Sequence, residues 1–115
     1  MLIFDDKYFI IVYNEKKIAL VLKNTEETGY TLCMYDTNGN QVMSTQFEGE
    51  YTNIKISKEQ IILYSGNTCA IFNTRGICKY QGTLENNIVD LYSITGLNKY
   101  MMISTNGFSE IQLVK

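Results

Sequence analysis

The sequence predicts an all-β protein made of consecutive four-stranded antiparallel units, and three observations support this. The chain repeats itself with a period of about 37 residues, and its apolar segments are short and rich in β-branched and aromatic residues. Turn residues separate these segments at regular intervals, and no segment shows the 3.6-residue spacing of an amphipathic helix. With 115 residues, 45% of them hydrophobic, the chain is expected to form a single domain over residues 1–115.

The repeat is clearest in two turns, YDTNG ending at Gly39 and FNTRG ending at Gly76, each lying between two apolar runs. A glycine at the fourth loop position is typical of hairpins built on a type I turn, where it takes a positive φ in a G1 bulge. Gly39 and Gly76 are predicted to be that residue. Asp36 and Asn73 are predicted to hydrogen-bond the backbone of their turns.

Each unit is predicted to contain four strands. In the middle unit these cover residues 52–57, 60–65, 68–73 and 77–84. The second and third strands are continuous apolar runs, such as IIL at 61–63 and LCM at 32–34, so their sheets are expected to pack against neighbours on both faces. In the loop between these strands, GN at 66–67 and NG at 106–107 predict two-residue hairpin turns.

Units of about 40 residues with a Y-D-x-x-G turn before the last strand resemble the blades of β-propellers. The fold class that this resemblance implies is all-β and β-propeller-like, a partial propeller of about three consecutive four-stranded antiparallel blades. The blades would lie at about residues 7–47, 51–84 and 88–115, with residues 1–4 forming the end of a strand from another blade. A β-sandwich or barrel is the other architecture considered.

The chain also resembles the C-terminal blades of an uncharacterised propeller family from clostridial bacteria, which end in a stretch similar to KYMMISTNGFSEIQLVK. Members of that family look like membrane-anchored proteins with an external propeller, so the resemblance implies the extracellular part of a longer protein. The chain itself leaves the compartment open. It contains no Trp, and therefore neither the Trp-Asp dipeptide of WD repeats nor the docking motifs of quinoprotein-type blades.

Composition excludes several classes of protein. A formal net charge of −2 argues against a nucleic-acid-binding protein, whose surface would be basic. No run reaches the roughly 18 apolar residues of a membrane span. Cys33, Cys69 and Cys78 are an odd set without C-x-x-C spacing, and the chain has no His, so free buried thiols are expected rather than disulfides or a zinc site.

The same absence of His removes the Ser-His-Asp site and the usual base for a catalytic cysteine. D-x-N-G at residues 36–39 is similar to the start of a calcium loop but lacks its acidic continuation, so it is interpreted as a turn. The sequence therefore predicts no enzyme, no cofactor and no metal site, but a non-catalytic binding or scaffolding module whose partner is a protein or peptide.

The other hypothesis is a small-ligand site, or a remnant enzyme, at the central channel of a larger propeller. Such a site needs polar side chains that point inward from the first strand of each blade. Four residues are candidates for this role: Asn53, Lys55, Asp90 and Ser93.

Loop charges are expected to divide between the two ends of the blades. The loops joining strands two and three, and one blade to the next, carry Asp5, Asp6, Glu26, Glu27, Glu48, Glu50 and Glu85 against Lys7. The opposite loops carry Lys16, Lys17, Lys58, Arg75 and Lys99 against Glu15, Asp36 and Glu59. The predicted binding residues are the acidic set Asp5, Asp6, Glu48, Glu50 and Glu85, which would attract a basic peptide or a cation.

Three blades leave open edges, and the third blade lacks its fourth strand. Residues 2–4 resemble the end of such a strand. They are therefore predicted to complete the third blade of a partner, so that two chains close a six-bladed ring. Otherwise the chain is a fragment of a longer propeller.

Overall fold

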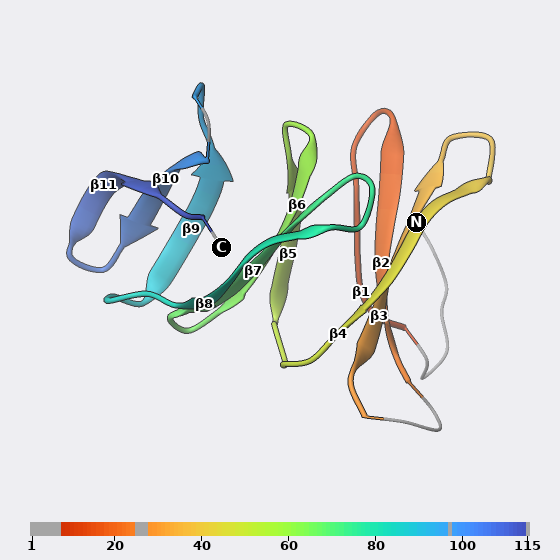
Figure 1. Ribbon diagram of the computed structural model, residues 1–115, viewed down its shortest axis with the longest axis horizontal. Helices are drawn as coiled ribbons and strands as arrows, with labels where there is room; N and C mark the ends of the chain where they lie inside the picture. The colour runs from red at the N-terminus through yellow and green to blue at the C-terminus, as the bar shows by residue number, and fades with distance from the viewer. Residues whose placement is uncertain (1–7, 25–27, 97, 115) are drawn as a thin grey trace.

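The computed structural model describes residues 8–24, 28–96 and 98–114, which contain eleven β-strands and no helix (Figure 1). The first sheet contains β1 (Tyr8–Tyr13), β2 (Lys17–Lys23), β3 (Tyr30–Asp36) and β4 (Gln41–Phe47). The second contains β5 (Asn53–Ser57), β6 (Gln60–Ser65), β7 (Thr68–Asn73) and β8 (Cys78–Thr83). The third contains β9 (Ile88–Ser93), β10 (Lys99–Ser104) and β11 (Gly107–Gln112).

Within each sheet, every strand pairs antiparallel with the next strand along the chain. The predicted all-β fold of consecutive antiparallel sheets is therefore confirmed. In the middle sheet the observed strands begin and end within one residue of the predicted bounds. Since the described residues form no helix, none of them belongs to a helix that could cross a membrane.

The two repeated turns have the same geometry. Oδ1 of Asp36 accepts hydrogen bonds of 2.9 and 3.0 Å from the backbone N–H groups two and four residues later, and Oδ1 of Asn73 accepts two bonds of the same lengths. Gly39 and Gly76 have φ angles of 86° and 85°, which side chains other than glycine rarely adopt. Both predictions for these turns are confirmed.

The tight turns between the second and third strands of a sheet follow the prediction in one case only. Gly66 begins a two-residue turn as expected, with φ of 60°. The expected Asn106-Gly107 turn is wrong by one residue, because Ser104 pairs with Gly107 and the loop residues are Thr105 and Asn106. The Ser104 hydroxyl explains the shift, since it accepts from the N–H of Asn106 and donates to the carbonyl of Gly107.

A bulge interrupts the last pairing in both four-stranded sheets. Val42 of β4 and Lys79 of β8 are each left without a partner in the ladder, because the register shifts by one residue beside them. A bulge re-aims the unpaired side chain relative to the regular alternation of the strand.

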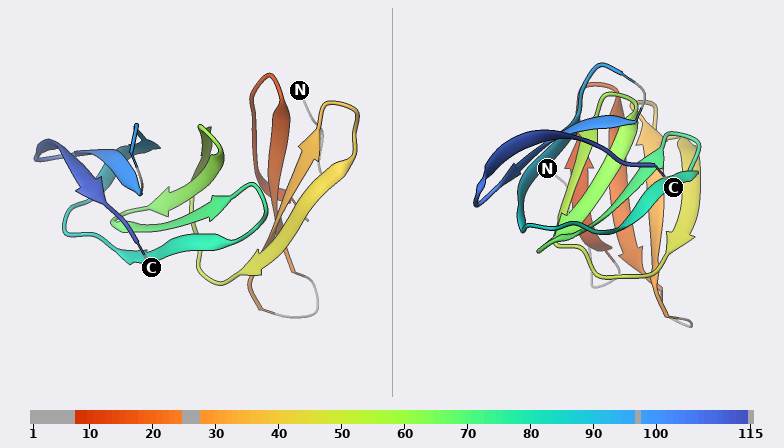
Figure 2. Two further views of the ribbon diagram at one scale, coloured as in Figure 1. Left: turned by 45° about the horizontal axis from the view of Figure 1, so that its top comes forward. Right: turned by 60° about the vertical axis from the view of Figure 1, so that its left-hand side comes forward.

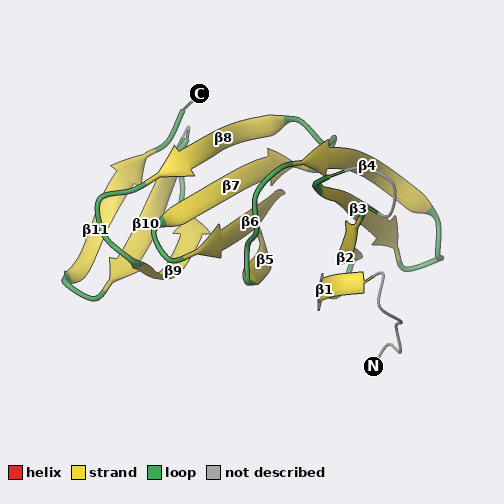
Figure 3. Ribbon diagram, turned by 90° about the horizontal axis from the view of Figure 1, so that it is seen from below, coloured by secondary structure: helices red, strands yellow, loops and turns green. Residues whose placement is uncertain are grey.

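The three sheets follow one another across the molecule in chain order (Figures 1 and 2). Seen end-on in Figure 3, they lie along an arc, with β1, β5 and β9 on its concave side and β4 and β8 on its convex side. The middle sheet therefore presents one face to the first sheet and the other to the third.

An aromatic cluster fills the space between the first and second sheets. The ring of Phe47 lies 5.7 Å from Tyr30, 6.0 Å from Tyr51 and 5.9 Å from Phe72, measured between centroids. The other buried members of this cluster are Ala19, Val21, Leu32, Met34, Met43, Ile61, Leu63 and Ala70. Burying each large apolar side chain contributes roughly 1.5–3 kcal/mol to stability.

A second cluster lies between the second and third sheets. Its buried members are Ile62, Tyr64, Cys69, Ile71, Ile88, Leu91, Tyr100, Met102 and Leu113. Consecutive residues of β6 thus point to opposite sides, since Ile61 and Leu63 pack on the first sheet and Ile62 on the third. All three are fully buried, so the predicted packing on both faces is confirmed for the middle sheet.

Candidate functional site

Three of the acidic residues predicted to bind a partner lie in loops at the lower end of the sheets in Figure 1. Glu48 and Glu50 lie in the loop from β4 to β5, and Glu85 lies in the loop from β8 to β9; all three are exposed. Asp5 and Asp6 lie outside the described residues, as do Lys7, Glu26 and Glu27.

Glu48 and Glu50 line one hollow of about 310 Å³, together with Lys23, Asn24, Thr28, Gly29, Tyr30 and Gly49. The Tyr30 hydroxyl donates a 3.1 Å hydrogen bond to Oε1 of Glu50, and the Thr28 hydroxyl lies 3.5 Å from Oε2 of Glu48. Burial raises the pKa of Tyr30, and the hydrogen bond to Glu50 and its negative charge raise it further. The two carboxylates are thereby held at the mouth of the hollow.

Glu85 lies in a different hollow at the same end. This hollow, of about 200 Å³, is also lined by Leu84, Asn86, Met102, Ser109, Ile111 and Leu113. Its walls are mostly apolar, and Glu85 contributes the one charged side chain among these lining residues. The acidic set is therefore divided between two hollows, with Glu48 and Glu50 together and Glu85 apart.

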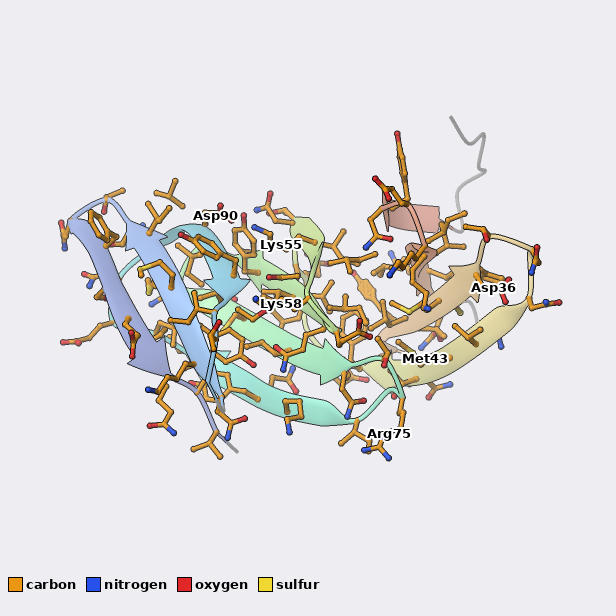
Figure 4. The ribbon with its side chains drawn as sticks, turned by 90° about the horizontal axis from the view of Figure 1, so that it is seen from above. Asp36, Met43, Lys55, Lys58, Arg75 and Asp90 are labelled. Atoms are coloured by element: carbon orange, nitrogen blue, oxygen red, sulfur yellow. The ribbon has the colours of Figure 1, made fainter. Side chains whose placement is uncertain are left out.

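The four polar residues expected to point into a central channel lie on β5 and β9. Nζ of Lys55 lies 2.8 Å from Oδ1 of Asp90, and the two side chains meet across the gap between the second and third sheets (Figure 4). The same ammonium lies 5.4 Å from the centre of the Tyr92 ring. Ser93 and Ser57 form the second link, in which the Ser57 hydroxyl accepts a 2.9 Å bond from the N–H of Ser93.

Asn53, the fourth of these residues, is exposed, and its side-chain amide lies 3.3 Å from the hydroxyl of Thr52. The other three bind one another or Ser57 across β5 and β9. Lys55 and Asp90 therefore neutralise each other's charge at this position instead of presenting it to a ligand.

At the opposite end, three of the predicted basic residues line one cleft of about 390 Å³ between the second and third sheets: Lys58, Arg75 and Lys99. Lys79 joins them. Lys79 is not among the predicted basic residues, because it lies in the predicted strand 77–84 and no signal in a single sequence marks the bulge that leaves it unpaired. Lys16 and Lys17 belong to the first sheet and do not line the cleft.

Within the described ranges, no three Asp, Glu or Cys side chains gather closely enough to hold a metal ion. The three cysteines are free thiols; Cys33 and Cys69 are buried, as predicted, whereas Cys78 is only half-buried. Burial raises the pKa of Cys69 to about 11, so this thiol stays protonated at neutral pH and is a poor nucleophile.

Residues 3–113 of the chain match a protein family described as a family of unknown function (DUF5711). The match covers all three sheets. No curated protein matches the chain.

Proposed function

Because the chain belongs to DUF5711, a family of unknown function, we propose from its own structure that it is a non-catalytic binding and scaffolding module built of β-propeller blades. The observation that carries this proposal is that the sheets differ in how far their faces are covered. The middle sheet is covered on both faces, whereas the outer faces of the first and third sheets carry apolar side chains that no sheet of the described residues covers.

The blade interpretation rests on how the sheets are related. Each sheet is an antiparallel meander of consecutive strands. The first strands of the three sheets, β1, β5 and β9, all lie on the concave side of the arc (Figure 3). In propellers the first strand of every blade lines the central channel in the same way. The pairs Lys55–Asp90 and Ser57–Ser93 join two such strands.

The two outer faces carry apolar residues at the same repeat positions as the buried faces of the middle sheet. On the first sheet, Ile18, Leu20 and Tyr35 alternate with the buried residues and are half-buried. The repeat aligns them with Ile61, Leu63 and Phe72, which are buried in the middle sheet.

The same holds for the third sheet. Met101, Ile103 and Phe108 face outward there and align with Ile62, Tyr64 and Cys69, which are buried. Phe108 is 77% exposed. An outer face that carries apolar side chains at the positions where the middle sheet buries them is suited to pack against another sheet.

The occupant that fits both outer faces is a second copy of the chain. Two chains related by a two-fold axis would place the third sheet of each on the first sheet of the other and close a six-bladed ring. Residues 2–4, which lie outside the described residues, would add the fourth strand to the partner's third sheet. This would satisfy the open edge of β11.

The oligomeric state tests this proposal directly. Light scattering after gel filtration at micromolar concentration is expected to give the mass of two chains, and Phe108→Asp is expected to give one. Ile77→Asp is the matched control, since Ile77 is half-exposed but lies in a turn of the middle sheet. A wild-type chain that is monomeric, or equal behaviour of the two variants, would reject the second copy as the occupant.

The partner that such a scaffold would hold is a basic protein or peptide at the acidic end. Glu48 and Glu50 supply two carboxylates at one hollow, and Glu85 extends the negative potential along the same end. An oligolysine peptide is a suitable probe. Reversing Glu48, Glu50 and Glu85 to Lys should weaken its binding and flatten the salt dependence, whereas reversing Glu15 and Glu59 at the other end should not. If the two variants bind the oligolysine peptide with equal affinity, Glu48, Glu50 and Glu85 are ordinary solvent-exposed loop charges and do not form a binding site.

A further inference from the structure

We propose that the cleft between the second and third sheets, at the end opposite the acidic residues, binds a small molecule that carries phosphate groups. It is bounded by the β5–β6, β7–β8 and β9–β10 loops and has a volume of about 390 Å³, within the size range of small-ligand sites. This site is separate from the acidic end and does not depend on how the sheets assemble.

Charge is the first argument for this ligand. Four cationic side chains line the cleft, Lys58, Lys79, Lys99 and Arg75, and the one carboxylate in the lining belongs to Glu59. The chain as a whole has a net charge of −2, so this concentration of positive charge is local. Converging charges of one sign in a concave site raise the local concentration of the opposite ion.

These cations are also available to a ligand. Among the described residues, Lys58, Lys79 and Arg75 form no ion pair, and Lys99 has only a long contact of 3.8 Å with Glu110 at the surface. Lysine binds phosphate as a point charge, while the planar guanidinium of arginine can donate two parallel hydrogen bonds to its oxygens. Figure 4, which looks onto this end, shows Lys58 near the middle of the molecule and Arg75 at its margin.

The floor of the cleft is fixed before any ligand arrives. The hydroxyl of Tyr100, which is almost fully buried, donates a 2.7 Å hydrogen bond to Oε1 of Gln60 across the two sheets. Ser93, also in the lining, is held by its bonds to Ser57. Because cross-sheet hydrogen bonds already hold these side chains in place, the cleft needs little rearrangement to bind a ligand. The loss of conformational entropy on binding is therefore smaller.

The backbone around the cleft provides an independent observation. Among the residues that the structure describes, two that are not glycine have positive φ, Lys58 at 55° and Asn98 at 58°, and both line this cleft. The left-handed conformation is unfavourable for a lysine, because it brings Cβ too close to the following carbonyl oxygen. Such conformations concentrate at binding sites, where the surrounding structure holds them in place.

The test uses the full chain, with inorganic pyrophosphate as the probe in isothermal titration calorimetry at low salt. The variant Lys58→Asn/Lys79→Gln removes two of the four cations, and asparagine tolerates the left-handed backbone at position 58. The matched control Lys16→Gln/Lys17→Gln removes two lysines at the start of β2 in the first sheet, neither of which lines the cleft. The dissociation constant should rise at least about tenfold in the cleft variant and less than about twofold in the control.

Two further arms sharpen the result. Glu59→Gln removes the opposing carboxylate and should tighten pyrophosphate binding. Citrate carries similar charge on carboxylates, and it should bind more weakly than pyrophosphate. Absence of pyrophosphate binding at millimolar concentration, equal losses in the cleft and control variants, or equal affinity for citrate would each overturn the proposal. Circular dichroism of each variant confirms that the sheets are intact.

Discussion

Lys55 of β5 and Asp90 of β9 form a 2.8 Å ion pair that joins the second sheet to the third on the concave side of the arc. The two side chains are 30% and 37% exposed, so water still screens part of their attraction. Oδ1 of Asp90 also accepts a 2.9 Å hydrogen bond from the N–H of Leu91, which fixes the carboxylate for its partner. The pair therefore positions the sheets relative to each other more than it adds to the total stability.

A double-mutant cycle with Lys55→Met and Asp90→Asn should measure this role. Asparagine keeps the acceptor for Leu91, so the cycle isolates the charge interaction. We expect a coupling free energy of about 0.5–1 kcal/mol in urea unfolding, in the upper range for partly exposed pairs. The coupling should fall when salt is added. Additive effects of the two substitutions would show that the contact does not stabilise the folded chain.

The strand order and turns could be predicted because their causes are local. In FNTRG, Asn73 stabilises the turn by accepting a hydrogen bond from its backbone, and Gly76 supplies the positive φ that the turn needs. The continuous apolar run of β6 likewise indicates burial on both faces of the sheet. The bulge at Lys79 could not be predicted, because it depends on how β7 and β8 pair. The predicted turn near Thr105 lies one residue too late, because the local hydrogen bonds of the Ser104 hydroxyl outweigh the signal of the Asn106-Gly107 pair.

The candidate sites divide in the same way. Loop position alone predicted which end carries Glu48 and which carries Lys58, since the meander alternates its loops between the two ends. Whether residues share one hollow depends on how adjacent sheets pack, as the separation of Glu85 from Glu50 shows. The pairing of Lys55 with Asp90 has the same origin, because the two residues belong to different sheets.

The core of the middle sheet should be sensitive to truncation. Leu63 is fully buried against the first sheet, so Leu63→Ala removes packing and leaves a cavity. We expect the free energy of unfolding to fall by about 2–5 kcal/mol in urea titrations. Ile77→Ala, at a half-exposed turn position, is the control and should change it by less than about 1 kcal/mol. Similar losses in both variants would contradict the assignment of Leu63 to the core.

Thiol reactivity should distinguish the cysteines. Burial raises the pKa of Cys69 from 9.0 to about 11, so at pH 8 its thiolate fraction falls about 100-fold. Iodoacetamide should therefore label Cys78, which is half-buried, much faster than Cys69 in the folded chain. Peptide mass spectrometry measures both rates, and in urea the two should become equal. Equal rates in the folded chain would contradict the burial of Cys69.

The turn at Asp36 should make part of the stability depend on acid pH. Two backbone N–H groups, first that of Asn40 and then that of Asn38, hold the pKa of Asp36 below its usual value of 3.8. A lowered pKa in the folded state means that the ionised form stabilises the turn fully above pH 3.8, and that this stabilisation is lost as the pH falls through the lowered value. Asp36→Asn keeps the acceptor, as Asn73 does in the second sheet, but cannot titrate. In urea unfolding between pH 5 and pH 2, the wild-type chain should therefore lose more stability than Asp36→Asn, and Asn73→Asp should lose more than the wild type. Parallel curves for the three chains would show that these hydrogen bonds do not favour the carboxylate.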